Sequence, residues 1–222
     1  MDPQNLPLSR LAVQGLRAPT RRLPAQALDW LLAIQGQDYA GSKWSVGLRL
    51  TAATDADIER AIERGELVRT WALRGTLHLV AAADLRWLLA LVGPQIIAGN
   101  ARRYRELELD EPTLRRSTEL LGEALAGGKR LDRPTLFAML QQHGVSTQGQ
   151  RGVYMLQRAS LEGVICQGAT RRNQPTFYRI DDALPPAAPK TEDEALAELA
   201  RRYFVSRGSA TLQDFIWWSG LR

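Results

Sequence analysis

Apolar residues recur at helical spacing through most of the first eighty residues. The segment 24–35 begins with a proline and places leucines on one face, which predicts a helix ending at Gln35. Segment 54–65 begins with the cap candidates Thr54 and Asp55 and ends at Gly65. Segment 67–80 alternates as strands do, and predicts a hairpin that turns near Arg74 and Gly75. The leucines expected to anchor the first helix are Leu28, Leu31 and Leu32.

The pattern is ambiguous in one place and repeats in another. Residues 42–50 fit a helix or a strand, because Trp44 and Leu48 have helical spacing while apolar residues also alternate there. Further along, two helices introduced by prolines and a third ending at Gly163 lead into a second hairpin over 164–180. A glycine-terminated helix followed by a hairpin therefore occurs twice.

This repeated order predicts a mainly α fold with small β-hairpin wings, arranged as tandem winged-helix domains. The expected units are residues 1–81 and 82–184. A linker rich in proline and alanine follows, and 190–222 holds two helices that predict a partial third unit, as expected for a fragment of a longer protein. We expect two separate hairpins and no continuous sheet of four or more strands within the first 180 residues.

The net charge is +5, and the arginines are concentrated in one segment. Residues 151–179 contain five arginines against one acid, Glu162. Such a basic segment is expected either of a polyanion binder or of a solvated face on an arginine-rich protein. In the first interpretation, the candidate phosphate contacts are Arg151, Arg158, Arg171 and Arg172.

Several classes of site are disfavoured by residue counts. The lone cysteine, Cys166, leaves no internal disulfide, and two histidines make zinc chemistry implausible, so neither a metal nor a cofactor is expected. No apolar stretch is long enough for a membrane span, and the N-terminus lacks the pattern of a secretion signal. These features predict a cytoplasmic protein without membrane partners.

Three motifs together resemble a known family. They are "IQGQD" (34–38), "RTWALRGTLHLV" (69–80) and "RGSATLQDFIWWSGL" (207–221). They look like the bacterial AlkZ/YcaQ-type winged-helix proteins, which include DNA glycosylases that remove bulky alkylated purines and unhook interstrand crosslinks. The family fold wraps three tandem winged helices around a C-terminal β-barrel, and nothing here corresponds to the barrel. The resemblance implies double-stranded DNA with a damaged base as the partner.

The family's catalytic motif has two glutamines, or a glutamine and an aspartate, separated by one apolar residue. It maps here onto Gln35 and Gln37, with Gly36 where a larger residue is expected. An amide has no useful pKa as a base, but it can hold a water by accepting and donating hydrogen bonds. An N7- or N3-alkylated purine is already cationic and leaves readily, so aiming a water at the sugar suffices. The alternative is that both amides cap the last carbonyls of the preceding helix.

The second motif and the tryptophans also leave alternatives open. Arg74, Thr76 and His78 share one face of a strand and are candidate DNA contacts; alternatively, Arg74 begins a tight turn and His78 is half-buried. Trp217 and Trp218 are expected in the core of the third unit, with base stacking as the lesser interpretation.

The sequence thus supports two main functions. The first is a monofunctional DNA glycosylase acting on alkylated (N7/N3-purine) or crosslinked bases, and the second is a non-catalytic winged-helix regulator or architectural protein. A regulator would read bases from a recognition helix such as 147–161 and would not need the two amides. A third option, contacts with other proteins, is disfavoured by the arginines of the second hairpin. The lesion, a role of Asp38 in the chemistry and the oligomeric state are not determined by the sequence.

Overall fold

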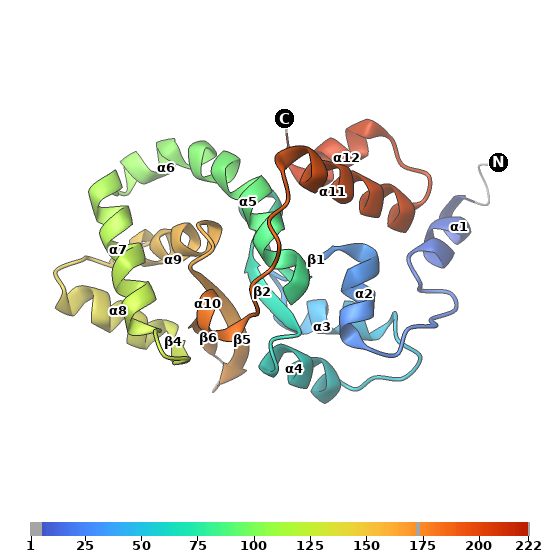
Figure 1. Cartoon of the computed structure of the whole chain (residues 1–222), viewed down its shortest axis with the longest axis horizontal. Helices are drawn as coiled ribbons and strands as arrows, with labels where there is room; N and C mark the ends of the chain where they lie inside the picture. The colour runs from blue at the N-terminus through green and yellow to red at the C-terminus, as the bar shows by residue number, and fades with distance from the viewer. Residues whose placement is uncertain (1–5, 172–173, 222) are drawn as a thin grey trace.

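The computed structural model describes residues 6–171 and 174–221. Helices make up most of this part of the chain, and its strands form an antiparallel sheet at the centre (Figure 1). The chain builds two stretches with the same order of elements on either side of the sheet and then a pair of helices near the C-terminus. The predicted mainly helical fold with small β-hairpins is confirmed.

The first stretch follows the short helix α1 (Leu6–Val13). Its elements run helix, strand, helix, helix, strand, strand: α2 (Pro24–Leu31), β1 (Ala33–Gln35), α3 (Tyr39–Gly47), α4 (Asp55–Glu63), β2 (Leu67–Trp71) and β3 (Leu77–Ala81). The 3-10 turn η2 (Leu73–Gly75) joins the last two strands. Thr54 caps α4, since its hydroxyl accepts from the amide of Asp57, and Gly65 ends this segment with φ +73°. Of the residues 42–50, which fitted a helix or a strand, 42–47 belong to the helix α3, which ends at Gly47.

Two helices, α5 (Ala82–Gly99) and α6 (Ala101–Glu106), lead to the second stretch. Its order of elements is the same: α7 (Glu111–Ala124), β4 (Leu131–Asp132), α8 (Arg133–Gln142), α9 (Arg151–Leu161), β5 (Ile165–Arg171) and β6 (Gln174–Arg179). In both stretches the first strand pairs with the third, β1 with β3 and β4 with β6. Gly163 has φ +73°, as Gly65 does. In each stretch, a glycine in the left-handed conformation therefore makes the turn from the last helix into the hairpin.

The two hairpins join into one six-stranded sheet of order β1-β3-β2-β5-β6-β4. The junction between β2 and β5 is a single residue pair, Arg69 with Gln167. The expectation of two separate hairpins and no continuous sheet of four strands is therefore wrong. The physical reason is that β2 and β5 are both edge strands of their hairpins, and unpaired backbone groups at an edge favour pairing with another strand.

The side chain of Arg69 strengthens this junction. It is only 9% exposed, and it donates from Nη1 to Gln167 Oε1 (2.9 Å), from Nε to the carbonyl of Gly36 (2.8 Å) and from Nη2 to the carbonyl of Gln37 (3.3 Å). Its guanidinium also lies 5.3 Å from the ring of Tyr39. One buried cation thus ties the first stretch to the second and holds the segment after β1.

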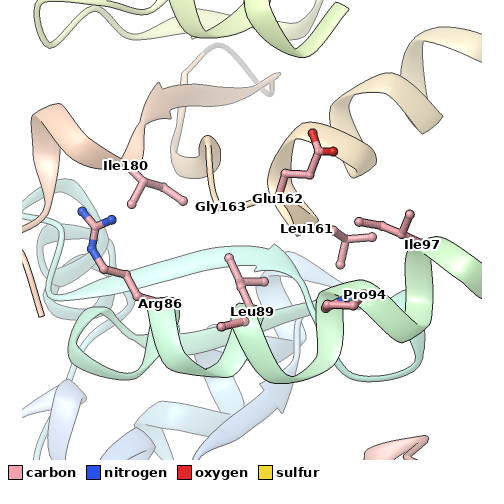
Figure 2. Close-up of a pocket in the computed structure, with 9 residues that line it drawn as sticks. Arg86, Leu89, Pro94, Ile97, Leu161, Glu162, Gly163 and Ile180 are labelled. Atoms are coloured by element: carbon pink, nitrogen blue, oxygen red, sulfur yellow. The ribbon is translucent and has the colours of Figure 1, made fainter. Parts of the chain in front are cut away.

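A cavity of about 380 Å³ separates α5 from the turn between α9 and β5 (Figure 2). Leu89, Pro94 and Ile97 of α5 face Leu161 and Gly163 across it. Beside it the two backbones touch, because a Cβ on Gly93 would lie 2.5 Å from the carbonyl oxygen of Leu161. The close contact fixes α5 against α9, and through them one stretch against the other.

The C-terminal part contains α10 (Ile180–Ala183), α11 (Glu192–Arg207) and α12 (Leu212–Ser219). Arg202 of α11 is buried, donates to the carbonyl of Leu28 in α2 (2.7 Å) and forms an ion pair with Asp84 of α5 (2.7 Å). Trp218 packs on Tyr203, with ring centroids 4.9 Å apart. The prediction that Trp217 fills a core is wrong: its side chain is 69% exposed, because α12 turns that face to solvent.

Replacing Arg69 by methionine should lower the free energy of unfolding by about 2–4 kcal/mol. The buried carbonyl of Gly36, the partly buried carbonyl of Gln37 and the side-chain amide of Gln167 would lose their donor. Each unsatisfied buried acceptor costs about 1–3 kcal/mol, partly offset because a buried charge is removed. The matched control is Arg60→Met, since Arg60 forms an exposed ion pair with Asp57 and should change stability by less than about 1 kcal/mol. Urea unfolding measures the free energy of unfolding of both variants. An equal loss of stability in the two would show that the contacts of Arg69 do not stabilise the junction.

Candidate functional site

The glutamine pair does not end a helix, contrary to the prediction. Helix α2 stops at Leu31, Leu32 turns the chain with φ 67°, and Gln35 is the last residue of β1, opposite His78 of β3. Pairing with β3 satisfies the backbone N–H and C=O groups that another helical turn would have satisfied. These residues therefore form a strand despite their helical spacing. The leucines expected to anchor this region, Leu28, Leu31 and Leu32, are buried.

Gly36 brings the chain unusually close to β3. Its amide donates to the carbonyl of Leu77 (2.6 Å), and a Cβ at this position would lie 3.2 Å from backbone atoms of His78 and Leu79. A larger residue would push the segment away from the sheet. The departure from the family motif at Gly36 therefore allows the glutamines on either side to be held tightly against β3.

Gln35 and Gln37 are both exposed. Gln35 is the last residue of β1, and Gln37 lies two residues further on, in the bend that leads into α3. Within residues 6–171 and 174–221 neither amide side chain has a hydrogen-bond partner, so the alternative that they cap the carbonyls of α2 is wrong. Their backbone is fixed, with the carbonyls of Gly36 and Gln37 bound to Arg69, while their side chains remain available.

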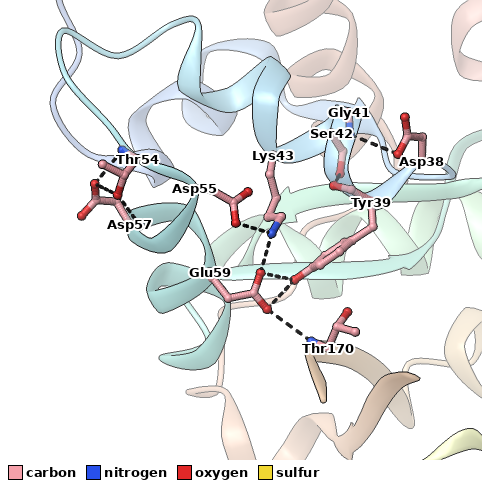
Figure 3. Close-up of polar contacts among 10 residues, drawn as sticks. All are labelled: Asp38, Tyr39, Gly41, Ser42, Lys43, Thr54, Asp55, Asp57, Glu59 and Thr170. Atoms are coloured by element: carbon pink, nitrogen blue, oxygen red, sulfur yellow. Dashed lines mark hydrogen bonds and ion pairs between the residues drawn. The ribbon is translucent and has the colours of Figure 1, made fainter. Parts of the chain in front are cut away.

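A polar network lies beneath this segment (Figure 3). Asp38 caps α3 by accepting from the amide of Gly41 (3.1 Å). The next residue, Tyr39, donates its hydroxyl to Glu59 of α4 (2.9 Å), and Glu59 also accepts from Lys43 (2.9 Å) and from the amide of Thr170 in β5 (3.3 Å). Glu59 thereby connects α3 and α4 to the second hairpin.

The charges of this network are balanced locally. Burial would lower the pKa of Lys43, but its hydrogen bonds to Asp55 and Glu59 raise that pKa above its ordinary value, so the ammonium stays charged. Burial, followed by the bond to Glu59, raises the pKa of Tyr39, so its hydroxyl stays neutral and donates. Burial lowers the pKa of Arg69, which has neutral acceptors and an aromatic ring around it.

Sequence reasoning did not identify Tyr39, Glu59, Arg69 or Gln167. The contacts that give them a role join residues from different elements, for example Glu59 with Thr170 and Arg69 with Gln167. The only local signal is the position of Asp38 and Tyr39 directly after the glutamine motif. No pattern of spacing in a single segment connects the others.

The three candidates on the first hairpin do not form one exposed wall. Arg74 is exposed in the turn with φ 57° and donates to the carbonyl of Trp218. Thr76 is half-buried and donates to the carbonyl of Leu73 (3.3 Å), which closes the turn. His78 is only 2% exposed, its Nδ1 lies 2.9 Å from the carbonyl oxygen of Thr76, and burial lowers its pKa to about 4. The alternative of a tight turn at Arg74 describes this hairpin, while His78 is more deeply buried than the half-buried position expected of it.

The arginines of the second stretch also separate into groups. Arg151 donates to the carbonyls of Ser146 (3.1 Å) and Glu108 (2.9 Å), so it fastens two loops. Arg158 has an 11% exposed side chain and forms ion pairs with Glu111 (2.7 Å) and Glu162 (2.6 Å), which leaves no free edge for a phosphate. Arg171 is exposed at the end of β5, and Arg172 lies outside the described residues. Of the four predicted phosphate contacts, the described geometry supports Arg171.

The described residues contain no group of three or more histidine, cysteine, aspartate or glutamate side chains that could hold a metal ion. Cys166 is buried, and burial raises the pKa of its thiol to about 12. In the same residues, no helix is long and apolar enough to cross a membrane.

Stability should fall in mild acid through His78. Its pKa is depressed in the folded state from 6.5 to about 4, so its contribution is complete above pH 6.5 and is lost as the pH falls toward 4. The unfolding free energy should drop by about 2–3 kcal/mol between pH 7 and pH 4.5 from this group. His78→Gln should remove that part of the dependence; identical pH profiles for both proteins, measured by urea unfolding, would contradict it.

Comparisons with known proteins show what the whole chain is similar to. A family model described as DNA glycosylase AlkZ-like matches residues 28–222. An interstrand DNA cross-link repair glycosylase of Streptomyces sahachiroi is 25% identical over 229 residues, which cover 96% of this chain and 59% of that protein. The solved structure of Streptomyces sahachiroi DNA glycosylase AlkZ matches with a TM-score of 0.72 at 21% identity, over 95% of this chain and 62% of that chain.

The chain thus spans about three fifths of the length of these two relatives. The structural match shows a shared fold, and the family model covers most of the chain. The resemblance that the three motifs predicted is therefore confirmed: the chain belongs to the AlkZ-like DNA glycosylase family.

Proposed function

We propose that this protein is a monofunctional DNA glycosylase that hydrolyses the N-glycosidic bond of an alkylated or crosslinked purine in duplex DNA. The observation that carries the proposal is the state of Gln35 and Gln37. Both are exposed, neither amide has a partner in the described residues, and their backbone is held by Arg69 and by β3. Family membership and the name of the curated relative support the same activity.

The chemistry suits two uncharged amides. A purine alkylated at N7 or N3 carries a positive charge and leaves the sugar without a strong acid. The enzyme then has to displace the nucleotide from the stack, stabilise an oxocarbenium-like sugar and position one water. Each amide can accept a hydrogen bond from that water and donate another to the sugar or the base. A backbone fixed in advance means that little reorganisation is needed when the reaction occurs.

The scaffold supports binding to a duplex. We propose that each repeated stretch is a winged helix, within residues 1–81 and 82–184, and that residues 190–222 begin a third. The order helix, strand, helix, helix, strand, strand, with the first strand paired to the third, supports this. In that arrangement α4 and α9 hold the place of recognition helices, and the hairpins β2–β3 and β5–β6 are the wings.

Replacing Gln35 or Gln37 by alanine should leave folding nearly unchanged, because both side chains are exposed. Release of the base from a duplex carrying an N7-alkylguanine should slow by about 10²–10³-fold for each, as for the loss of one preorganised donor or acceptor elsewhere. Affinity for the duplex should change little, since neither residue is charged.

The matched control for this experiment is Gln142→Ala, which removes another exposed glutamine at the end of α8. Full excision by the double variant at positions 35 and 37 would show that the amides are not catalytic. No release of base by the unaltered protein would favour the non-catalytic alternative, a regulator or architectural protein that binds DNA.

Arg171 should contact a phosphate, because it is exposed at the tip of the second hairpin and, among the described residues, forms no ion pair. Arg171→Ala should weaken binding to any duplex sequence alike and reduce the log–log dependence on salt by about 0.9. Fluorescence anisotropy over a range of salt measures this. Arg158→Lys is a suitable comparison, since Arg158 is engaged with two glutamates and should leave the slope unchanged; an unchanged slope for Arg171→Ala instead removes it from the interface.

A further inference from the structure

A pocket of about 460 Å³ lies between α1, α11, α12 and the turn of the first hairpin. Its charged lining residues are three arginines and one acid: Arg10, Arg74, Arg207 and Asp214. Three aromatic residues also line it: Tyr203, Trp217 and Trp218. Three segments that are distant in the sequence therefore place cations and aromatic faces around one hollow.

Arg207 lines this pocket and has no carboxylate partner in the described residues. It donates from Nη1 to the carbonyl of Leu31 (3.1 Å) and to the hydroxyl of Ser206 (2.6 Å). Its guanidinium lies 5.1 Å from the ring of Trp218 and 5.6 Å from that of Tyr203. Burial lowers its pKa to about 10, so it remains charged at neutral pH with its charge uncompensated.

The two other arginines each use part of the guanidinium to bind a backbone carbonyl, and both residues are exposed. Arg10 donates to the carbonyl of Ser209 (2.8 Å), and Arg74 donates to the carbonyl of Trp218. In the described part of the chain neither forms an ion pair within 4 Å. Carbonyl contacts orient each guanidinium and leave the remaining N–H groups free for another acceptor.

Asp214 does not neutralise the pocket. Its carboxylate accepts from the amide (2.8 Å) and the hydroxyl (2.9 Å) of Thr211, as the capping box of α12. These bonds, with a smaller effect of Arg10, lower its pKa. Asp214 therefore stays ionised, and its single negative charge against three arginines leaves the pocket net positive.

The pocket borders the segment that carries the two glutamines. Arg74 belongs to the turn that ends just before Leu77, whose carbonyl accepts the amide of Gly36. Arg207 bonds to Leu31 at the end of α2, directly before β1. A strand of DNA that presents a nucleotide to Gln35 and Gln37 would therefore pass close to these arginines.

We propose that this pocket binds a phosphodiester of the DNA strand next to the displaced nucleotide, with a neighbouring base stacked on Trp217. The proposal deepens the proposed function and rests on DNA being its ligand. Arginine's planar fork matches the oxygens of a phosphate, and three such groups surround the pocket. Trp217 is 69% exposed at its rim, as a stacking platform for an unpaired base requires.

The first experiment measures binding to a lesion-free duplex by anisotropy over a range of salt. Arg10→Gln should reduce the log–log salt slope by about 0.9, and adding Arg74→Asn should reduce it by about as much again. Asparagine is chosen because it tolerates the positive φ of Arg74. The control is Arg116→Gln, an exposed arginine of α7 that should leave the slope unchanged. An unchanged slope in the double variant overturns the pocket as a phosphodiester site.

The second experiment tests the stacking with a short single-stranded oligothymidylate. Trp217→Ala should weaken its binding on the order of tenfold, while the dependence on salt stays the same. Inorganic phosphate at constant ionic strength should not compete; competition at millimolar concentration would overturn the proposal in favour of a free-phosphate site. An unchanged affinity for the oligonucleotide would overturn the role of Trp217.

These outcomes are separable from those of the proposed glycosylase activity. The pocket is judged by affinity and salt slope on undamaged DNA, where the double alanine variant at positions 35 and 37 should bind normally. Base release is judged on the alkylated duplex. Reduced salt slopes in the Arg10 and Arg74 variants, without any release of base by the unaltered protein, would support the pocket and contradict the glycosylase activity. Release of base by the unaltered protein, with unchanged salt slopes in those variants, would support the activity and contradict the pocket.

Discussion

The structure depends on one buried cation, the guanidinium of Arg69. Its three bonds reach the carbonyls of Gly36 and Gln37 and the amide of Gln167, so the same side chain closes the central sheet and holds the glutamine segment. A buried arginine is costly to desolvate, and here that cost is offset by neutral acceptors and by the ring of Tyr39 rather than by a carboxylate. The position of the candidate site is thus tied to the docking of the two repeated stretches.

Arginines in this protein serve two physical roles. Arg158 and Arg202 are buried and paired with carboxylates, and they join helices to one another. Arg69 and Arg207 are surrounded by carbonyls and aromatic rings instead, which leaves their charge uncompensated. Both of the latter contact the backbone next to β1. Uncompensated positive charge therefore lies beside the segment that carries the exposed amides, next to the paired charges of Lys43 and Glu59.

Two exposed amides can serve as a catalytic pair only if something else holds them still. Gln35 and Gln37 have no side-chain partners of their own in the described residues, so their precision comes from the backbone. Gly36 allows a close contact with β3, where a Cβ would lie 3.2 Å from backbone atoms of His78 and Leu79. The sheet supplies this rigidity, and the reaction of a cationic purine asks for little more than a positioned water.

The sequence by itself determined most of the local elements, although not β1, and it determined the family, because periodicity, caps and motifs are local. Gly65 and Gly163 ended their segments and opened two hairpins as predicted, and the motifs around the glutamines identified the relatives. Only the tertiary structure decided that the hairpins join, that His78 is enclosed and that Trp217 is exposed. The physical reason is that each of these outcomes depends on residues far away in the chain. An edge strand pairs with whichever strand the packing brings beside it, and a side chain is buried or exposed according to what packs against it. The spacing of residues within one segment carries no information about those neighbours.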